Sequence, residues 1–329
     1  MSVLLLREPE IRELISYPET IEAVEKAFAE FSSGRAVMPG VINLDLDSYQ
    51  GEVHIKSAYL RGGDHYVIKV ASGFYRNPAL GLPVGNGLML LFEAETGRLR
   101  GVLFDNGYIT EMRTGAAGAV AAKYLARRDA SRVGLVGSGS QARYQVRALL
   151  EVRAVQEVRV WSPHHDHAAD YAAEMAAALP RVRFEPVPAC EDAVRGADIV
   201  ITATPSRDPL VRAEWVSPGT HITAVGSDGP GKQELDVGVL RLADIIVCDS
   251  RTQCARLGEV QHGLAARVLT RRRLPAELGE IVLGRKPGRA NDLQISVADL
   301  TGLGVQDAAA ASLVFQKSLA EGRGETIEI

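Results

Sequence analysis

The first third of the chain combines one helical pattern with short runs of strand type. Apolar residues recur at helical spacing through residues 18–35, and Gly34 ends the pattern. Four further runs are short and apolar or alternate apolar with polar positions, and Gly, Asn and Asp turns separate them; they span residues 51–60, 65–74, 87–97 and 98–106. This pattern predicts a helix followed by a mostly antiparallel sheet.

Strands and helices alternate from Thr114 onward. The residues after Thr114 form a Gly/Ala-rich helical pattern, which we expect Thr114 to cap. Short Val/Ile-rich runs follow at residues 131–137, 157–162, 182–187, 197–205, 221–226 and 243–250, with Ala-rich helical segments between the early ones. Near-continuous apolar strands alternating with helices are typical of a parallel sheet covered on both faces, so this part is predicted to be a doubly wound α/β (Rossmann) domain.

The tail predicts a discontinuous domain. Residues 301–322 have the pattern of a long helix with a Gly-rich start, and residues 325–329 that of a final strand. We expect this tail to pack on the first part of the chain. The predicted division is therefore an α+β substrate-binding and dimerisation domain of residues 1–113 and 305–329, and a dinucleotide-binding domain of residues 114–304; 329 residues also exceed what one core usually supports.

Composition excludes several classes of partner. The chain is 46% hydrophobic and 24% charged, as soluble globular proteins are, and its net charge of −4 favours neither nucleic acid nor an anionic membrane. No apolar stretch approaches the roughly 20 residues of a membrane span, and the N-terminal apolar run is too short for a signal peptide. Cys190, Cys248 and Cys254 lack a CxxC spacing, which indicates reduced thiols in a cytoplasm. The basic run at residues 271–273 is interpreted as solvated charge.

The motif "VGLVGSGSQAR" at residues 133–143 follows a predicted strand and opens a predicted helix. Gly137 permits a tight turn, Gly139 lets the backbone approach a pyrophosphate, and Ala142 allows close packing of helix on strand. The helix N-terminus at Ser140 and Gln141 supplies unpaired N–H groups for phosphate. In this context the motif predicts dinucleotide binding rather than a merely structural glycine turn.

The cofactor type depends on the end of the second strand of this domain. NAD-binding domains usually place an acid there to bind the ribose hydroxyls. The strand here ends in Trp161, Ser162, Pro163 and His164 instead. We therefore expect NAD(H) or NADP(H), leaning to NADP(H), with Ser162, His164 and Arg143 near the 2′-phosphate. The histidines of "HHDH" are interpreted as part of a solvated loop, and no metal site is predicted.

Cations in the first domain indicate an anionic substrate. His54 and Lys56 point to the same face of one predicted strand, and Lys69 interrupts an apolar strand. Lys69 is either an edge-strand lysine that discourages aggregation or a ligand-binding group. Arg113, at the proposed domain junction, is either part of a solvated salt bridge or a second ligand-binding group. Together Lys69 and Arg113 suit a small carboxylate, because Arg offers a bidentate fork and Lys a point charge.

Asp228 lies in "ITAVGSDGPGKQELD", directly after the fifth predicted strand of the second domain. An acid in a glycine-rich loop is often a turn former. Ligands of doubly wound sheets, however, bind outside the carboxyl ends of the strands. A carboxyl group in a partly desolvated cleft can exchange protons near neutral pH, so Asp228 is the candidate general acid/base.

Several motifs in order resemble the ornithine cyclodeaminase/mu-crystallin family over nearly the whole chain. They are "ITEMRTGAAGAVAAKYLAR", "VGSGSQA", "TATPSRDPLVRAEWVSPGTHITAVGSDGPGKQELD" and "DLTGLGVQD". The segment "SDGPGKQELD" is similar to archaeal-type alanine dehydrogenases. The segments "GEVHIKSAYL" and "NPALGLPVGNGLMLLFEAETG" are similar to the cyclodeaminase-like proteins of ectoine utilisation.

The resemblance implies roles for individual residues and a homodimer. It places the substrate carboxylate on Lys69 and Arg113, and the general acid/base at Asp228. It implies cofactor contacts from Thr114, Gly137, Gly139, Gln141, Thr204 and Val225. Many members carry an arginine where this chain has His54, with Lys56 two residues later, so the identity of the substrate does not transfer.

Three functions follow from the resemblance. The first is an NAD(P)-dependent imine or ketimine reductase, or L-amino-acid dehydrogenase, acting on a small amino or imino acid. The second is a cyclodeaminase, which eliminates ammonia and regenerates its cofactor; no residue is assigned to orient the distal amine that it would need. The third is a non-catalytic, cofactor-dependent binding protein of crystallin type. The first is preferred to the second because that residue is unassigned, and to the third because both cations and the acid are present.

Overall fold

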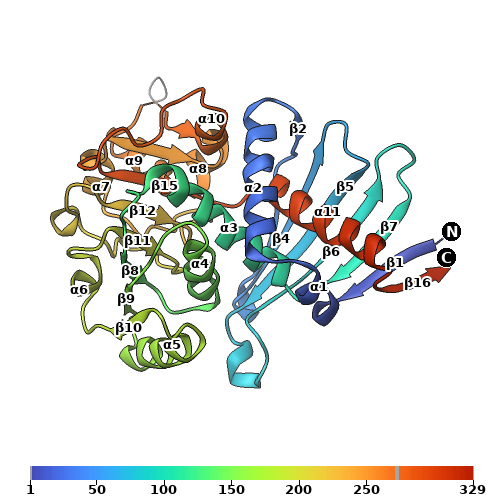
Figure 1. The fold of residues 1–329 in the computed structure, drawn as a ribbon, viewed down its shortest axis with the longest axis horizontal. Coiled ribbons are helices and arrows are strands. Elements are labelled where there is room, and N and C mark those ends of the chain that lie inside the picture. Colours follow the sequence, from blue (N-terminus) through green and yellow to red (C-terminus); the bar gives the residue numbers. More distant parts are fainter. Residues whose placement is uncertain (1, 271–273, 329) are drawn as a thin grey trace. The chain divides into compact units, whose positions relative to one another are not determined.

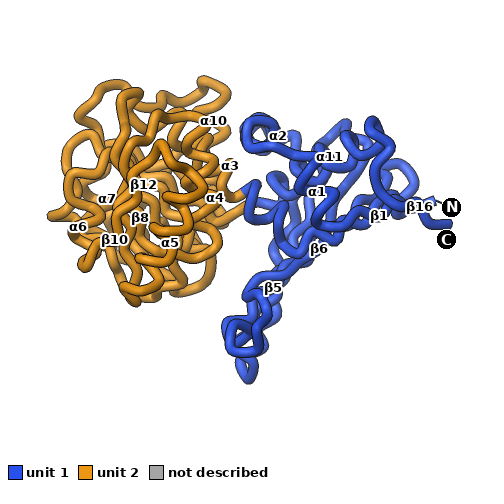
Figure 2. The backbone as a smooth tube through the Cα atoms, turned by 60° about the horizontal axis from the view of Figure 1, so that its bottom comes forward, with its two compact units in different colours: residues 1–113, 303–329 blue, residues 114–302 orange. Residues whose placement is uncertain are grey.

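The computed structural model describes residues 2–270 and 274–328, and the basic run at residues 271–273 lies outside them. The chain divides into two compact units, one of residues 1–113 and 303–329 and the other of residues 114–302 (Figures 1 and 2). We call them unit 1 and unit 2. Helix α3 (Tyr108–Leu125) begins in unit 1 and continues into unit 2.

Unit 1 is built on an eight-stranded sheet in the order β16-β1-β7-β6-β5-β4-β2, with β3 paired to β4. All pairs are antiparallel except β1 with β7, so the prediction of a mostly antiparallel sheet is confirmed. The strands are β1 Ser2–Arg7, β2 Ala36–Val37, β3 Ile42–Leu46, β4 Gly51–Leu60, β5 His65–Phe74, β6 Gly85–Glu93, β7 Leu99–Phe104 and β16 Glu325–Glu328. Strands β1, β2 and β3 were not among the predicted strands.

Helices cover one face of the unit 1 sheet. Helix α11 (Gly304–Glu321) packs on β4 and β5 and against α2 (Tyr17–Ser32), while α1 (Glu8–Leu14) packs on β1 and β7 (Figure 1). Phe28 and Phe315 from these helices, and Met89 and Leu103 from the sheet, are fully or almost fully buried. The 3-10 turns η1 (Asp47–Tyr49) and η2 (Asn77–Leu80) follow β3 and β5, and the far end of β5 extends away from the helices (Figure 2).

Unit 2 is a doubly wound sheet of parallel strands in the order β10-β9-β8-β11-β12-β15-β13-β14, as predicted. The strands are β8 Arg132–Val136, β9 Glu157–Trp161, β10 Arg183–Pro186, β11 Ile199–Thr202, β12 His221–Ala224, β13 Ile245–Cys248, β14 Ala276–Glu277 and β15 Ser296–Asp299. The helices are α4 Ser140–Leu150, α5 His165–Ala178, α6 Cys190–Val194, α7 Val237–Leu242, α8 Arg251–Leu257, α9 Glu259–Ala265 and α10 Leu278–Val282, and η3 is Ala213–Trp215.

Apolar side chains on both faces of the unit 2 sheet explain its covering by helices. Leu135 and Val160 pack with Val146 of α4 on one face, whereas Val200 and Ile222 belong to a core on the other. The order in which successive strands are added to the sheet reverses at β8. Strands β9 and β10 lie on one side of β8, and β11 and the later strands lie on the other. The carboxyl ends of β8 and β11 therefore form the switch point where such folds bind ligands. Strand β15 was not predicted, and it separates β12 from β13.

The predicted N-cap at Thr114 is wrong. Helix α3 begins six residues earlier, at Tyr108, so Arg113 and Thr114 both lie inside it. The side chain of Asp105 accepts a hydrogen bond of 2.8 Å from the Ile109 N–H and so completes the first turn. Because an acid three residues before a helix start also satisfies its free N–H groups, Thr114 was not needed for this purpose.

Candidate active site

The glycine-rich turn after β8 has the geometry of a phosphate cradle. Gly137 has φ +108°, and an added Cβ would lie 2.6 Å from the carbonyl oxygen of Ala203, so only glycine fits. At Gly139 a Cβ would meet no protein atom within 4 Å, which leaves the turn open in front of the N-terminus of α4. The residues present thus fit a dinucleotide pyrophosphate, since backbone N–H groups and the helix dipole face an open cradle.

A cavity of about 390 Å³ adjoins this turn and brings together predicted residues from the ends of three strands. Its lining comprises Gly137, Ser138, Gly139, Arg143, Ser162, Pro163, His167, Asp170, Ala203, Thr204 and Pro205. The predicted His164 is the N-cap of α5 and is not part of the lining, although its ring lies 5.1 Å from that of His167. His167 and Asp170 were missed, because α5 turns these positions, not His164, toward the cavity.

Arg143 reaches the cavity, but other groups already bind its charge. Its Nε lies 2.9 and 3.0 Å from the two carboxylate oxygens of Glu174, and its Nη1 donates to the carbonyls of Ser138 and Gly139. Glu174, one turn along α5 from Asp170, was not predicted. The guanidinium therefore braces the glycine-rich turn and is largely neutralised before any phosphate arrives.

A buried acid connects the ends of β11 and β12. Glu234 accepts hydrogen bonds from the Thr202 hydroxyl at 2.7 Å, the Thr204 N–H at 2.6 Å and the Gly226 N–H at 2.9 Å. Burial raises the pKa of Glu234, and these donors oppose the rise. The predicted Thr204 and Val225 thus lie at the ends of neighbouring strands. Glu234 was not predicted, because nothing in the sequence around it indicates that its side chain is buried.

Asp228 lies in the loop that follows β12, and it forms an ion pair. The Nζ of Lys232 is 2.8 Å from its Oδ1. The Asp228 side chain is 42% exposed and that of Lys232 is 12% exposed. The carboxylate is therefore accessible and faces a cation, whereas the sequence suggested a partly desolvated environment.

Lys69 and Arg113 are buried in unit 1 and share one carboxylate. The Lys69 Nζ lies 2.9 Å from Oδ2 of Asp307, and the Arg113 Nε lies 2.7 Å from Oδ1. Lys69 is only 2% and Arg113 only 4% exposed, and β5 lies between β4 and β6. Neither an edge-strand lysine nor a solvated salt bridge describes them. Asp307 was missed, because nothing local in the sequence links it to residues 69 and 113.

Burial and charge set the ionisation of this cluster. Burial lowers the pKa of Lys69 to about 7, and the Asp307 carboxylate opposes this effect. Burial also acts to raise the pKa of Asp307, but Arg113 and Lys69 hold it below its ordinary value. Lys56 on β4 is the register partner of Lys69, and its charge reaches both groups. His54 lies one position further along the same face, 3.6 Å from a carboxylate oxygen of Glu52.

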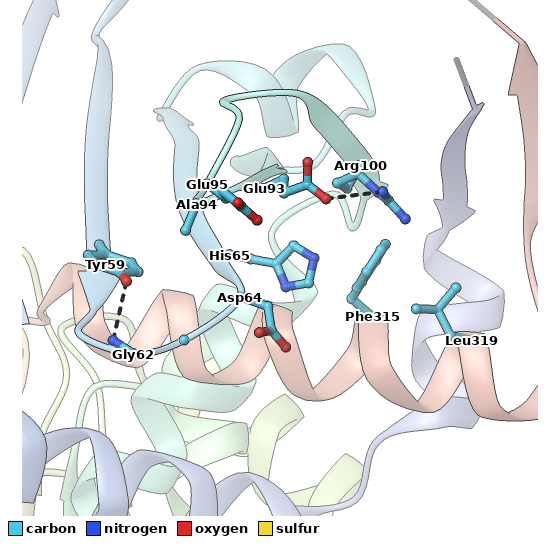
Figure 3. Close-up of a pocket in the computed structure, with 11 residues that line it drawn as sticks. Tyr59, Gly62, Asp64, His65, Glu93, Ala94, Glu95, Arg100, Phe315 and Leu319 are labelled. Carbon is cyan, nitrogen blue, oxygen red and sulfur yellow. Dashed lines mark hydrogen bonds and ion pairs between the residues drawn. The ribbon is translucent and has the colours of Figure 1, made fainter.

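A further cavity of unit 1 lies apart from every predicted site residue. It has a volume of about 510 Å³, and Figure 3 shows three carboxylates around it, from Asp64, Glu93 and Glu95. His65 packs edge-on against Phe315, with ring centroids 5.0 Å apart, and Glu93 pairs with Arg100 at 3.3 Å. The cavity is thus an acidic surface hollow, and the predicted chemistry lies elsewhere.

Metal-binding clusters and membrane-spanning helices are both absent from the described residues, 2–270 and 274–328. No cluster of three or more His, Cys, Asp or Glu side chains there could hold a metal ion. No helix in these ranges is long and apolar enough to cross a membrane.

The parallel sheet, its switch point and the phosphate cradle define a protein with a Rossmann-type dinucleotide-binding unit and a second, discontinuous unit. Comparison with known proteins identifies the family. The chain belongs to the ornithine cyclodeaminase/mu-crystallin family, whose model matches residues 2–322, so the predicted resemblance is confirmed.

Three relatives span different activities. An uncharacterized cyclodeaminase of Sinorhizobium fredii is 41% identical over 98% of both chains. The structure of an archaeal alanine dehydrogenase dimer with bound NAD is 38% identical, with a TM-score of 0.92 over 100% of both chains. The Δ1-pyrroline-2-carboxylate reductase of Thermococcus litoralis, in complex with NADH and L-proline, is 34% identical, with a TM-score of 0.93 over 99% of this chain and 100% of that one.

Proposed function

We propose that this protein is an NAD(P)-dependent oxidoreductase that acts at the C–N bond of a small α-imino or α-amino acid. The observation that carries the proposal is the buried pair of cations, Lys69 and Arg113, in a chain that also has a dinucleotide cradle. The two buried cations share one carboxylate, that of Asp307, so an anionic substrate can balance the remaining positive charge. The relatives named above, an alanine dehydrogenase and a pyrroline-2-carboxylate reductase, support this choice.

The substrate carboxylate is bound by Lys69 and Arg113. The Nε of Arg113 faces Asp307, and its Nη1 donates to Gln306 at 2.9 Å, which fixes the plane of the guanidinium. A fixed guanidinium and an adjacent ammonium orient a carboxylate more strictly than either does alone. Lys56 and His54, on the same strand face, are assigned to the substrate's side-chain end.

Asp228 is assigned to the proton transfer at the substrate nitrogen. Its accessible carboxylate accepts a proton from the amine in the oxidative direction and returns it to the imine in the reductive direction. Bound nicotinamide would supply or accept the hydride at the adjacent carbon. Gly137, Gly139, Ser140, Gln141 and Ala142 are assigned to the pyrophosphate, with Thr114, Ser162, Thr204 and Val225 along the rest of the cofactor.

The alternative function is a cyclodeaminase, and the relative in Sinorhizobium fredii favours it. The two activities differ in one observable. A reductase or dehydrogenase consumes cofactor in proportion to product, whereas a cyclodeaminase releases ammonia without net change in cofactor.

A paired assay separates these functions. One arm follows NAD(P)H oxidation with pyruvate, glyoxylate, oxaloacetate or cyclic ketimines, with ammonia or methylamine present where an amine is needed. The other follows ammonia release from ornithine, lysine and diaminobutyrate. We expect cofactor turnover that is lost in Asp228→Asn. Ammonia release without cofactor turnover would assign a cyclodeaminase, and cofactor binding without activity in either arm would favour the non-catalytic binding protein.

For the cofactor, we propose that both NAD(H) and NADP(H) bind and that NADP(H) is preferred. No carboxylate stands directly after Trp161 at the end of β9, and Ser162 and His167 line the cavity there together with Asp170 of α5. Because Glu174 holds Arg143, the preference rests on Ser162 and His167. A kcat/KM more than about tenfold higher with NADH than with NADPH would contradict it.

We further propose a homodimer formed through the open face of the unit 1 sheet. Side chains on the face opposite α11 are apolar and only partly buried, among them Ile55, Ile68 and Val70, and Ile42 and Leu44 of β3 are exposed. An apolar face of this kind marks an association surface. Light scattering should show a dimer that Ile68→Asp dissociates, while Leu319→Asp, on exposed α11 surface, leaves it intact.

The location proposed is the cytoplasm. Cys190, Cys248 and Cys254 are all free and buried, which supports a reducing compartment.

A further inference from the structure

The motif "DLTGLGVQD" at residues 299–307 ends in the first turn of α11, and the proposed function assigns no role to its last residue, Asp307. Gly304 begins the helix, and a Cβ there would lie 2.8 Å from the carbonyl oxygen of Ser57 on β4. Only glycine lets the helix start so close to the strand. This approach places the next polar residues of the turn, Gln306 and Asp307, over β4 and β5.

Asp307 and Gln306 are completely or almost completely buried, and each contacts a substrate-binding cation. Both carboxylate oxygens of Asp307 lie within 3.0 Å of the Lys69 Nζ, and Oδ1 also lies 2.7 Å from the Arg113 Nε. The amide oxygen of Gln306 accepts from the Arg113 Nη1 at 2.9 Å and from the Leu303 N–H at 3.0 Å. One turn of helix therefore fixes both cations.

The charges around Lys69 come from three elements and from the turn before α3. Asp307 of α11 favours its ammonium form, whereas Arg113 of α3 and Lys56 of β4 oppose it. Asp105, which precedes α3, is also buried, and the ammonium of Lys69 favours its ionised form. Lys69, Arg113 and Asp307 together carry one net positive charge, so the charge available to a carboxylate depends on Asp307.

We propose that Asp307 is a positioning residue for the substrate carboxylate: it holds Lys69 and Arg113 in one geometry and keeps the ammonium of Lys69 charged. This inference rests on the proposed function, in which these two cations bind the carboxylate. Asp307 itself would repel the substrate carboxylate and acts only through the cations.

The first test is the pH profile of kcat/KM for Asp307→Asn, a change that keeps shape and removes charge. An opposite charge within about 4–6 Å shifts an ionisation by roughly one to three pH units. We therefore expect the basic limb, where Lys69 loses its proton, to move to lower pH by about one unit or more. In a Lys69→Arg background the same change should not move the limb, because a guanidinium keeps its proton. A limb that stays in place in the Lys69 enzyme would overturn the proposal.

Asp307→Glu tests positioning separately and covers the case in which Asp307→Asn does not fold. Its charge is kept while the carboxylate is displaced by one methylene group. We expect a raised KM with the basic limb in place. A KM equal to that of the wild type, or a limb displaced as far as in Asp307→Asn, would overturn the positioning role.

A titration without substrate separates failure of this inference from failure of the proposed function. The chain has only seven lysines, so selective isotopic labelling gives a simple NMR spectrum in which Lys69→Arg identifies the Lys69 signal. The pH at the midpoint of the Lys69 titration should fall in Asp307→Asn. It should stay in place in the control Glu19→Gln, which removes the ion-pair partner of Lys317, a lysine that lies on α11 as Asp307 does. An unchanged midpoint in Asp307→Asn would refute the charge coupling. The expected fall in a protein inactive toward all imino acids would leave the coupling intact and refute the proposed function.

Discussion

Lys232→Gln should lower the catalytic efficiency by an amount that the ion pair between Lys232 and Asp228 limits. The variant removes the ammonium group 2.8 Å from the Asp228 carboxylate. It keeps the backbone carbonyl of residue 232, which contacts His262 and accepts from the Ser227 hydroxyl. Without the ammonium group, the Asp228 carboxylate loses the partner that holds it in one position, so kcat/KM should fall.

The exposure of the pair limits the size of this effect. With Asp228 42% exposed, solvent screens the attraction, and such pairs contribute about 0.2–1 kcal/mol. Since 1.36 kcal/mol corresponds to a factor of ten, kcat/KM should fall by roughly 1.4- to 5-fold. A deeply buried pair would give a larger loss.

The assay is kcat/KM in both reaction directions, with Lys232→Arg as the charge-preserving control. The loss should occur in both directions, because the proposed mechanism uses the same carboxyl group as the base for oxidation and the acid for reduction. An unchanged kcat/KM, or an equal loss in Lys232→Arg, would refute the role of Asp228 or of its ion pair.

Three other predictions concern different parts of the chain. Glu174→Gln should release Arg143 to bind the 2′-phosphate of NADPH. The ratio of kcat/KM for NADPH to that for NADH should then rise by about tenfold, the effect expected of one charge-assisted hydrogen bond. An unchanged ratio would mean that Arg143 does not reach the 2′-phosphate. Burial lowers the pKa of His221 to about 3, so the folded state resists protonation and stability falls as pH drops below about 6.5. Urea unfolding should show about 2 kcal/mol lost from this group between pH 6.5 and 5, a loss absent in His221→Asn. Gly304→Ala should raise KM several-fold by pushing α11 away from Ser57, and a KM like that of the wild type would show that the close approach is not needed.

The sequence predicted most of the fold because its strands follow local patterns. Residues 51–60 and 65–74 alternate so clearly that the predicted bounds match β4 and β5. Strand β15 was missed because residues 296–299 are small and lie close to the glycine-rich start of α11, where turn signals dominate. The start of α3 was missed because its first turn is completed by Asp105, from outside the helical pattern.

The candidate site could be predicted only where a motif encodes it. The turn at Gly137 and Gly139 is a local signal, since a tight turn and an open cradle both require glycine. The partners of the predicted residues are long-range contacts: Asp307 lies 238 residues from Lys69. A contact of this kind leaves no local periodicity, so Asp307, Glu174 and Glu234 emerged only with the fold.

The most direct test of the central claim compares one cyclic imine with and without its carboxylate. The claim is that Lys69 and Arg113 bind the substrate carboxylate, and two charge-assisted hydrogen bonds at about 1.5–3 kcal/mol each predict a preference of roughly 10²–10⁴-fold in kcat/KM. We expect Δ1-pyrroline-2-carboxylate to be preferred over Δ1-pyrroline by at least this lower factor, and the preference to collapse in Lys69→Met. Equal kcat/KM values for the two imines in the wild type would contradict the account.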